Sequence, residues 1–122
     1  MPLPASLMMA ALALAVAADA AAADAAHGQE LYESRCGGCH SLDANRVGPA
    51  HRGVYGRKAG TAANFSYSTA VKSSTVVWEE KTLDAWLTNP QGLIPGQRMN
   101  FRVALPEDRA DIIAYLRQQS SK

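Results

Sequence analysis

Apolar residues recur at helical spacing in the second half of the chain, and they predict its main regular elements. The segment VVWEEKTLDAWLTNP (76–90) places Leu83, Trp86 and Leu87 on one face of a helix. Its two adjacent glutamates favour the helix N-terminus, and its closing Asn-Pro pair ends the helix.

The same pattern returns at the end of the chain in LPEDRADIIAYLRQQ (105–119). Ile112, Ile113 and Leu116 would form the buried stripe of a helix, and Pro106 suits a first helical position. An earlier helix is predicted to begin near Gly28 and to lead towards the cysteines of the chain.

Two irregular stretches separate these helices. NRVGPAHRGVYGRKAGTAANFSYS (45–68) and QGLIPGQRMNFRVA (91–104) are rich in Gly and Pro, which argues against a long regular element in either. No stretch alternates as a strand would. The fold class predicted from the pattern is therefore a small all-α domain with long loops.

The N-terminal residues have the pattern of a secretory signal peptide. An apolar stretch at 7–18, too short to span a bilayer, is followed by small-residue A-x-A patterns. We therefore predict a signal peptide over 1–26, cleaved somewhere between 20 and 26, and a single domain over 27–122. No Lys or Arg precedes the apolar stretch, so an Ala-rich helix of a soluble protein is the alternative interpretation. Export would place the protein in the periplasm.

Charge and size narrow the function classes. Of the 122 residues, 12 are Lys or Arg and 11 are Asp or Glu. Removing Asp19 and Asp24 with the leader leaves 9 acidic residues and a net charge of about +3, which does not indicate nucleic-acid binding. A domain of under about a hundred residues has a marginal core unless a disulfide, a metal or a buried cofactor supports it.

Both cysteines of the chain lie in ESRCGGCHSL (33–42). A structural zinc ion needs four ligands, usually from two separated pairs, and only one cysteine pair exists here. A thioredoxin-type dithiol would follow a strand in a βα pattern, which is absent. A disulfide across C-x-x-C would close a very small loop and would stabilise the fold little. None of these interpretations explains the histidine that follows.

Covalent haem attachment explains the whole C-x-x-C-H motif. Cys36 and Cys39 would each add to one vinyl group of the haem, and His40 would be the proximal ligand of the iron. In electron carriers the other axial ligand is Met or His. Met99 is the methionine that remains after leader cleavage, and it is the predicted sixth ligand, with His51 and His27 as competitors.

From Gly28 to the last helix the chain resembles the class I cytochromes c, especially the mitochondrial-like bacterial members. The shared motifs occur in the family's order: CGGCH, VGP, GVYGRKAG, FSYS, the single W at 78, TLDAWLTNP, IPGQRMNF and IAYL. The resemblance implies a small cytochrome c fold. In that fold the N- and C-terminal helices cross, and the loops wrap around one covalently bound haem and its iron.

The resemblance also implies roles for further residues. The carbonyl of Pro49 would accept a hydrogen bond from the His40 ring, and Arg57 would lie near a haem propionate. Tyr67 and Trp78 occupy positions whose O–H and N–H groups reach the propionates in the family, and Phe101 would shield the haem edge.

The same resemblance implies how two helices pack. Gly28 would let the first and last helices cross closely, with Tyr32 packing beside Tyr115.

The sequence also departs from the family at several positions. Trp86 stands where many members have a Tyr that hydrogen-bonds the Met sulfur, so its indole N–H replaces that bond or leaves the sulfur free. His51 stands where an aliphatic residue usually packs on the haem, and the sequence offers no account of it.

The remaining departures concern a loop wall and the surface charge. Val71 stands where Asn is frequent, which makes that wall drier, and the segment from His40 to Pro49 is shorter than in mitochondrial members. The lysine pair near the haem edge is missing. Only Arg98 remains there, with Arg46, Arg52 and Arg102 as further candidate contributors, so steering towards an acidic partner should be weaker.

The function predicted is a soluble, monomeric, single-haem electron carrier with no enzymatic activity. The expected partners are redox proteins: a quinol-oxidising membrane complex, a terminal oxidase or peroxidase, or a periplasmic dehydrogenase. An enzyme or gas sensor with a labile Met99 is the alternative, although no evident distal acid–base pair accompanies it. A thiol–disulfide oxidoreductase is a third class, and it would need free thiols.

Overall fold

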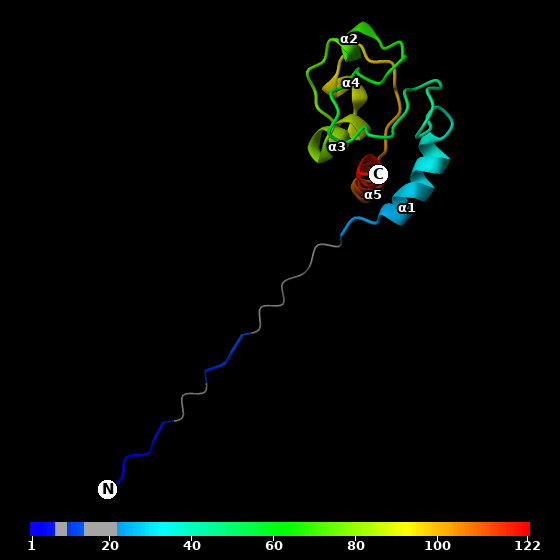
Figure 1. Ribbon diagram of the computed structural model, residues 1–122. Helices are drawn as coiled ribbons and strands as arrows, with labels where there is room; N and C mark the ends of the chain where they lie inside the picture. The colour runs from blue at the N-terminus through cyan, green and yellow to red at the C-terminus, as the bar shows by residue number, and fades with distance from the viewer. Residues whose placement is uncertain (7–9, 14–21) are drawn as a thin grey trace.

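The computed structural model describes residues 1–6, 10–13 and 22–122 and shows helices and long loops gathered into one body (Figure 1). Its helices are α1 (Ala25–Leu31), the π-helical turn η1 (Tyr32–Cys36), α2 (Thr69–Lys72), α3 (Glu80–Thr88), α4 (Pro90–Leu93) and α5 (Pro106–Ser120). The β pairing in these described ranges is a single isolated antiparallel bridge between Lys58 and Val77. The predicted all-α class is confirmed.

Most of the apolar stretch of the predicted signal peptide falls on residues 7–9 and 14–21, which lie outside the described residues. The predicted cleavage after Ala20 lies there as well. Among the residues that are described, no helix has the length and apolar character needed to cross a bilayer.

Helices α1 and α5 pack directly against each other at Gly28. A Cβ at this glycine would overlap the backbone carbonyl of Asp111 on α5, so only hydrogen fits at the crossing. Next to the crossing, the Tyr32 and Tyr115 rings lie 5.4 Å apart between centroids. The close crossing and the tyrosine contact that the sequence predicted are both confirmed.

We expect Gly28→Ala to destabilise the protein, although alanine is the better helix former by about 1 kcal/mol. The added methyl group meets backbone atoms, which cannot rotate away, so the two helices must separate. Overpacking of this kind typically costs about 1–3 kcal/mol. Urea unfolding of the haem-loaded protein measures the change. Gly38→Ala is the control, because a Cβ there meets no atom within 4 Å, and equal stability losses in the two variants would contradict the argument.

Helix α1 begins at Ala25, ahead of the predicted start near Gly28. Asp24 is its N-cap, and the Asp24 carboxylate accepts a hydrogen bond of 3.1 Å from the backbone N–H of His27. The Asp24 backbone N–H in turn donates to Oδ1 of Asp111, at 2.7 Å. The start of α1 is therefore joined to α5 by polar contacts as well as by packing.

The His27 side chain adds an ion pair to this junction. Its Nδ1 lies 2.8 Å from Oδ2 of Asp111, and this hydrogen bond raises the pKa of His27 above its usual value. The same bond, together with the Asp24 N–H, lowers the pKa of Asp111. The pair is consequently charged on both sides in mildly acidic solution.

We expect the stability difference between wild type and His27→Asn to depend on pH. Because the folded-state pKa of His27 is raised, the contribution is complete below about pH 6.5 and is lost as pH rises through that higher pKa. Urea unfolding at about pH 5.5 and pH 8.5 measures the difference, which should shrink at the higher pH. Asp111→Asn should remove the same dependence, and a difference that grew with pH would contradict this assignment.

Helix α3 has clear start and stop signals. Glu79 and Thr82 form a reciprocal capping box, in which each side chain accepts a hydrogen bond from the other's backbone N–H. Leu83 and Leu87 are the buried residues of the helix. Pro90, predicted only as a stop, also opens the short helix α4 as its first residue, within the stretch predicted to be irregular.

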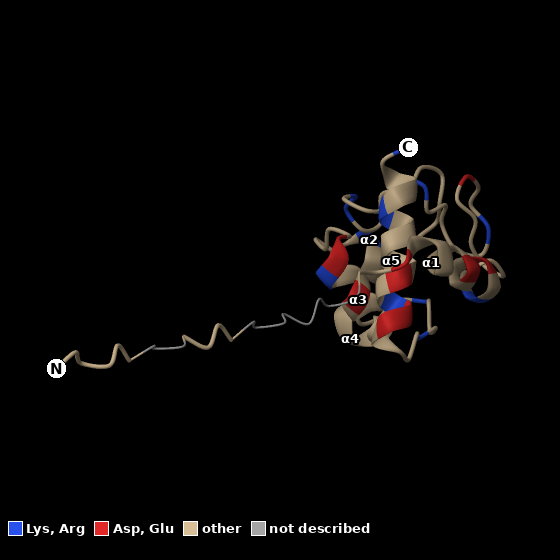
Figure 2. Cartoon of the chain, turned by 90° about the horizontal axis from the view of Figure 1, so that it is seen from below, with Lys and Arg blue, Asp and Glu red and all other residues tan. Residues whose placement is uncertain are grey.

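Helix α5 carries a buried charge that fixes the loop before it. Nε of Arg109 donates to the Asp84 carboxylate on α3 at 2.7 Å, and Nη1 donates to the carbonyls of Val103 and Ala104. Acidic residues flank this arginine in the first half of α5 (Figure 2). The segment that leads from Met99 to α5 is thus tied to two helices at its far end.

Candidate cofactor-binding site

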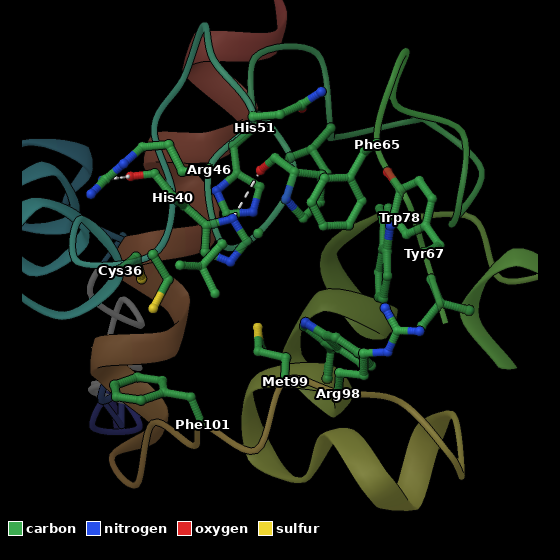
Figure 3. Close-up of a pocket in the computed structure, with 18 of the residues that line it drawn as sticks. Cys36, His40, Arg46, His51, Phe65, Tyr67, Trp78, Arg98, Met99 and Phe101 are labelled. Atoms are coloured by element: carbon green, nitrogen blue, oxygen red, sulfur yellow. Dashed lines mark hydrogen bonds between the residues drawn. The ribbon is translucent and has the colours of Figure 1, made fainter. Parts of the chain in front are cut away.

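A cavity of about 760 Å³ lies between the loops and the helices, with mostly apolar walls. Figure 3 shows the side chains that point into it. All ten predicted site residues line it: Cys36, Cys39, His40, Pro49, Arg57, Tyr67, Trp78, Trp86, Met99 and Phe101. These residues, spread over most of the domain in sequence, therefore border one continuous cavity.

The two cysteines lie on a tightly wound turn at the end of η1. The Gly37 N–H donates to the carbonyl of Tyr32, a five-residue step that defines the π-helix. The N–H groups of Cys39 and His40 both donate to the carbonyl of Cys36. Both thiols are free, with Cys36 half-buried and Cys39 exposed.

Burial sets the protonation state of the Cys36 thiol. Burial raises the pKa of the Cys36 thiol to about 11, because Arg35 only partly offsets the loss of solvation. Reactive dithiols work through a thiolate and have lowered pKa values. The Cys36 thiol is therefore protonated near neutral pH.

The His40 imidazole is neutral and held in one orientation. Its Nδ1 lies 2.9 Å from the carbonyl oxygen of Pro49, the hydrogen bond that the resemblance implied, which leaves Nε2 free to bind a metal. Burial lowers the pKa of His40. A Cβ at Gly48 would overlap the His40 ring, so the loop backbone packs directly against it.

Met99 faces His40 across the cavity. In Figure 3 the Met99 sulfur points towards the imidazole of His40, and the Cys36 sulfur points into the same space. Neither of the two histidines that competed for this role lies opposite His40. His51 is stacked on His40, with ring centroids 3.9 Å apart, and His27 pairs with Asp111 on α5.

Polar groups and aromatic rings occupy one wall of the cavity. The Arg57 guanidinium donates to the carbonyls of Ala50 and Arg52 and also lines the cavity. The Tyr67 hydroxyl accepts a hydrogen bond from a loop N–H. Trp78 and Trp86 pack with ring centroids 5.2 Å apart. A buried acidic group of a cofactor would meet a fixed positive charge beside these rings.

Sequence reasoning missed two residues that organise this wall. Arg46 folds over the cysteine-bearing turn and donates to the carbonyls of Gly37, Gly38 and His40. Asn45 donates to the carbonyl of Ala63 and accepts from the N–H of Ala50, which joins two loops. The residues next to Arg46 and Asn45 in the sequence do not indicate these roles, because every one of the contacts depends on how the loops fold.

The mouth of the cavity combines apolar and basic residues. Val47 is 77% exposed and Phe101 is 42% exposed, and both line the cavity. Arg98 lies on the same lining, and its Nη1 donates to the carbonyl of Ser66 at 3.5 Å. Arg52, by contrast, is paired with Asp43, which removes most of its contribution to any positive rim.

The donor set fits a haem. The cavity offers an apolar slot, two free thiols on one turn, a neutral imidazole with one nitrogen free, and a thioether on the facing side. A structural zinc ion needs four ligands, and the described part of the chain brings no three His, Cys, Asp or Glu side chains together as a metal site. Met and His are the usual axial pair of haem in electron carriers.

Comparisons with known proteins agree with this site. The family model described as Cytochrome c matches residues 25–120. A cytochrome c from Euglena viridis is 45% identical over 93 residues, covering 74% of this chain and 91% of that protein. A cytochrome c from Chlamydomonas reinhardtii is 41% identical over 100 residues, covering 79% of this chain and 89% of its own. The structure of cytochrome cH from Methylobacterium extorquens superposes with a TM-score of 0.75 at 39% identity, covering 78% of this chain and 98% of its own.

Proposed function

Because the chain belongs to the cytochrome c family, we propose that it carries single electrons between redox proteins, with His40 and Met99 as the axial ligands of its haem. Family membership establishes a c-type haem, with Cys36 and Cys39 as its attachment pair. The observation that carries the ligand proposal is the placement of His40 and Met99 on facing sides of the cavity.

The bound haem supplies an iron that alternates between its ferrous and ferric states. The protein's part is to hold both axial positions, so that neither face of the ring is open to a substrate. His40 is fixed through Pro49, and the segment that bears Met99 is fixed at its far end by Arg109. Such a site exchanges electrons through its exposed edge, where Val47 and Phe101 form the apolar rim.

An enzyme or gas-sensing role is the alternative, and it would require Met99 to leave the iron. The optical spectrum of the purified protein, recorded with and without reductant, tests the proposal together with carbon monoxide titration at neutral pH. We expect a low-spin, six-coordinate spectrum that carbon monoxide does not change. Ready binding of carbon monoxide by the reduced protein would refute the carrier role.

Export and partners complete the proposal. A leader over 1–26, cleaved between 20 and 26, would deliver the domain 27–122 to the periplasm as a soluble monomer. The partners would be a quinol-oxidising complex, a terminal oxidase or peroxidase, or a periplasmic dehydrogenase. Arg46 and Arg98 line the cavity, and Arg52 is neutralised by Asp43, so electrostatic steering should be modest.

A further inference from the structure

His51 lines the cavity, and the proposed electron transfer gives it no role. Its ring lies nearly parallel to that of His40, with centroids 3.9 Å apart and planes 21° apart. The contact is therefore a face-to-face stack between two imidazoles, one of which is the proposed iron ligand.

The His51 side chain is itself fixed by Tyr32. The Tyr32 hydroxyl and Nδ1 of His51 share a hydrogen bond of 2.9 Å, and the two rings meet edge-on at 5.6 Å. Tyr32 is 4% exposed and packs on Tyr115 of α5. A chain of contacts thus runs from the crossing of α1 and α5 to the face of the His40 ring.

The backbone around His51 is equally restrained. Its N–H donates to the carbonyl of Ser41, and its own carbonyl accepts from the N–H of Val54. Side chain and main chain together leave the His51 ring little freedom to turn. A ring held in this way is a rigid surface against which the neighbouring imidazole must lie flat.

Two different restraints therefore act on the His40 ring. The carbonyl of Pro49 holds Nδ1 at one point of the ring edge, which fixes the tautomer but leaves some rotation about that direction. The stack with His51 restrains the plane as a whole, because turning the ring would break the parallel contact. Neither restraint substitutes for the other.

The choice of histidine suits both contacts. A flat ring is needed to stack on an imidazole, and a ring nitrogen is needed to meet the Tyr32 hydroxyl. Burial, the His40 ring and the charge of Arg57 lower the pKa of His51 to about 3, so the ring carries no charge near neutral pH. An aliphatic residue would fill the space but would supply neither contact.

We propose that His51 is a positioning residue, held by Tyr32, which fixes the orientation of the His40 imidazole plane above the haem. The inference rests on the proposed ligation of the iron by His40. In the oxidised protein, the orientation of this plane contributes, together with that of the opposite ligand, to how the unpaired electron is distributed over the haem. The haem methyl resonances of the paramagnetic state are therefore sensitive to it.

The test compares four oxidised, haem-loaded proteins by proton NMR: wild type, His51→Leu, Tyr32→Phe and Tyr115→Phe. His51→Leu should shift the haem methyl resonances most, because it removes the stack. Tyr32→Phe should shift them in the same direction but less, because it removes only the hydroxyl that holds His51. Tyr115→Phe loses a hydroxyl from the same aromatic group without touching His51, and its spectrum should match wild type.

The red absorption band of the iron–sulfur bond is recorded for the same samples, so that the two proposals can be separated. If wild type lacks that band, the ligation proposal fails. If the band is present in all four proteins but His51→Leu and Tyr32→Phe leave the methyl resonances unchanged, the ligation stands and the positioning role of His51 is refuted. A lower unfolding temperature with unchanged resonances would also refute it, since His51 would then be packing alone. Should His51→Leu fail to incorporate haem, the Tyr32→Phe spectrum decides between these outcomes.

Discussion

Replacing Met99 with Ala is expected to abolish the weak red absorption band of the oxidised protein and to lower its reduction potential. A thioether stabilises ferrous iron relative to ferric iron, so removing it favours the oxidised state. Axial ligands tune haem potentials over about 0.8 V, and a loss on the order of 0.1 V or more is expected here. Optical spectroscopy and a redox titration measure the two effects.

The variant should keep its fold, so the spectral change can be attributed to the iron. The segment that carries Met99 is held by contacts that do not involve the sulfur. The Val103 N–H donates to the carbonyl of Leu87 at 2.8 Å, and Arg109 binds the carbonyl of Val103. At the other end, Gly96 turns the chain with a φ of +92°, a conformation that glycine adopts without strain.

Phe101→Leu is the matched control for this experiment. Phe101 lies on the same segment at the cavity mouth, and 42% of it is exposed, so its replacement should leave the band intact. An unchanged band in Met99→Ala would show that the sixth ligand had been wrongly assigned. Loss of the band in both variants would point to disorder of the whole segment instead of loss of one ligand.

Replacing both cysteines with Ala is expected to abolish covalent haem and with it the stable fold. The cavity of about 760 Å³ would then have no tethered occupant. Its mostly apolar walls would then be exposed to water, and the burial that the haem provides would be lost. A small domain has a total stability of only about 5–15 kcal/mol. Circular dichroism and acid extraction of the haem measure folding and attachment.

The single variants separate the two thiols. Cys36→Ala and Cys39→Ala should each retain one thioether at most, with reduced haem content. Ser34→Ala is the control, because it removes a hydrogen bond to Leu31 within the same turn but leaves both thiols in place. Normal haem content in both single cysteine variants, resistant to acid extraction, would contradict attachment at these positions.

The long helices could be predicted from sequence because their signals are local. Pro106 and the acidic residues after it mark the start of α5, and the Glu79 cap marks that of α3. The start of α1 was placed too late because Asp24 stands in an alanine-rich run, where its capping role is not apparent. Helix α4 was missed because Pro90 was interpreted only as a terminator, whereas proline is also favoured at a first helical position.

The site residues were predictable where chemistry restricts the choice of residue. Two cysteines, one adjacent histidine and one remaining methionine left few candidates for covalent attachment and iron ligation. The supporting contacts were not predictable in the same way. Arg46 binds carbonyls on a turn that its own loop must first reach, and Tyr32 meets His51 only after α1 and the following loop have packed. Such contacts form only in the tertiary structure and produce no periodic pattern in the sequence.

The cap at Asp24 has a consequence for how an exported precursor would mature. Processing after Ala25 or Ala26 would remove both the capping carboxylate and the N–H that binds Asp111, whereas processing at a bond ahead of Asp24 would retain them. An N-cap of this kind contributes about 1 kcal/mol. The position of leader cleavage would therefore affect the free energy of unfolding of the mature protein. Two maturation products that differ by a few residues would differ measurably in stability.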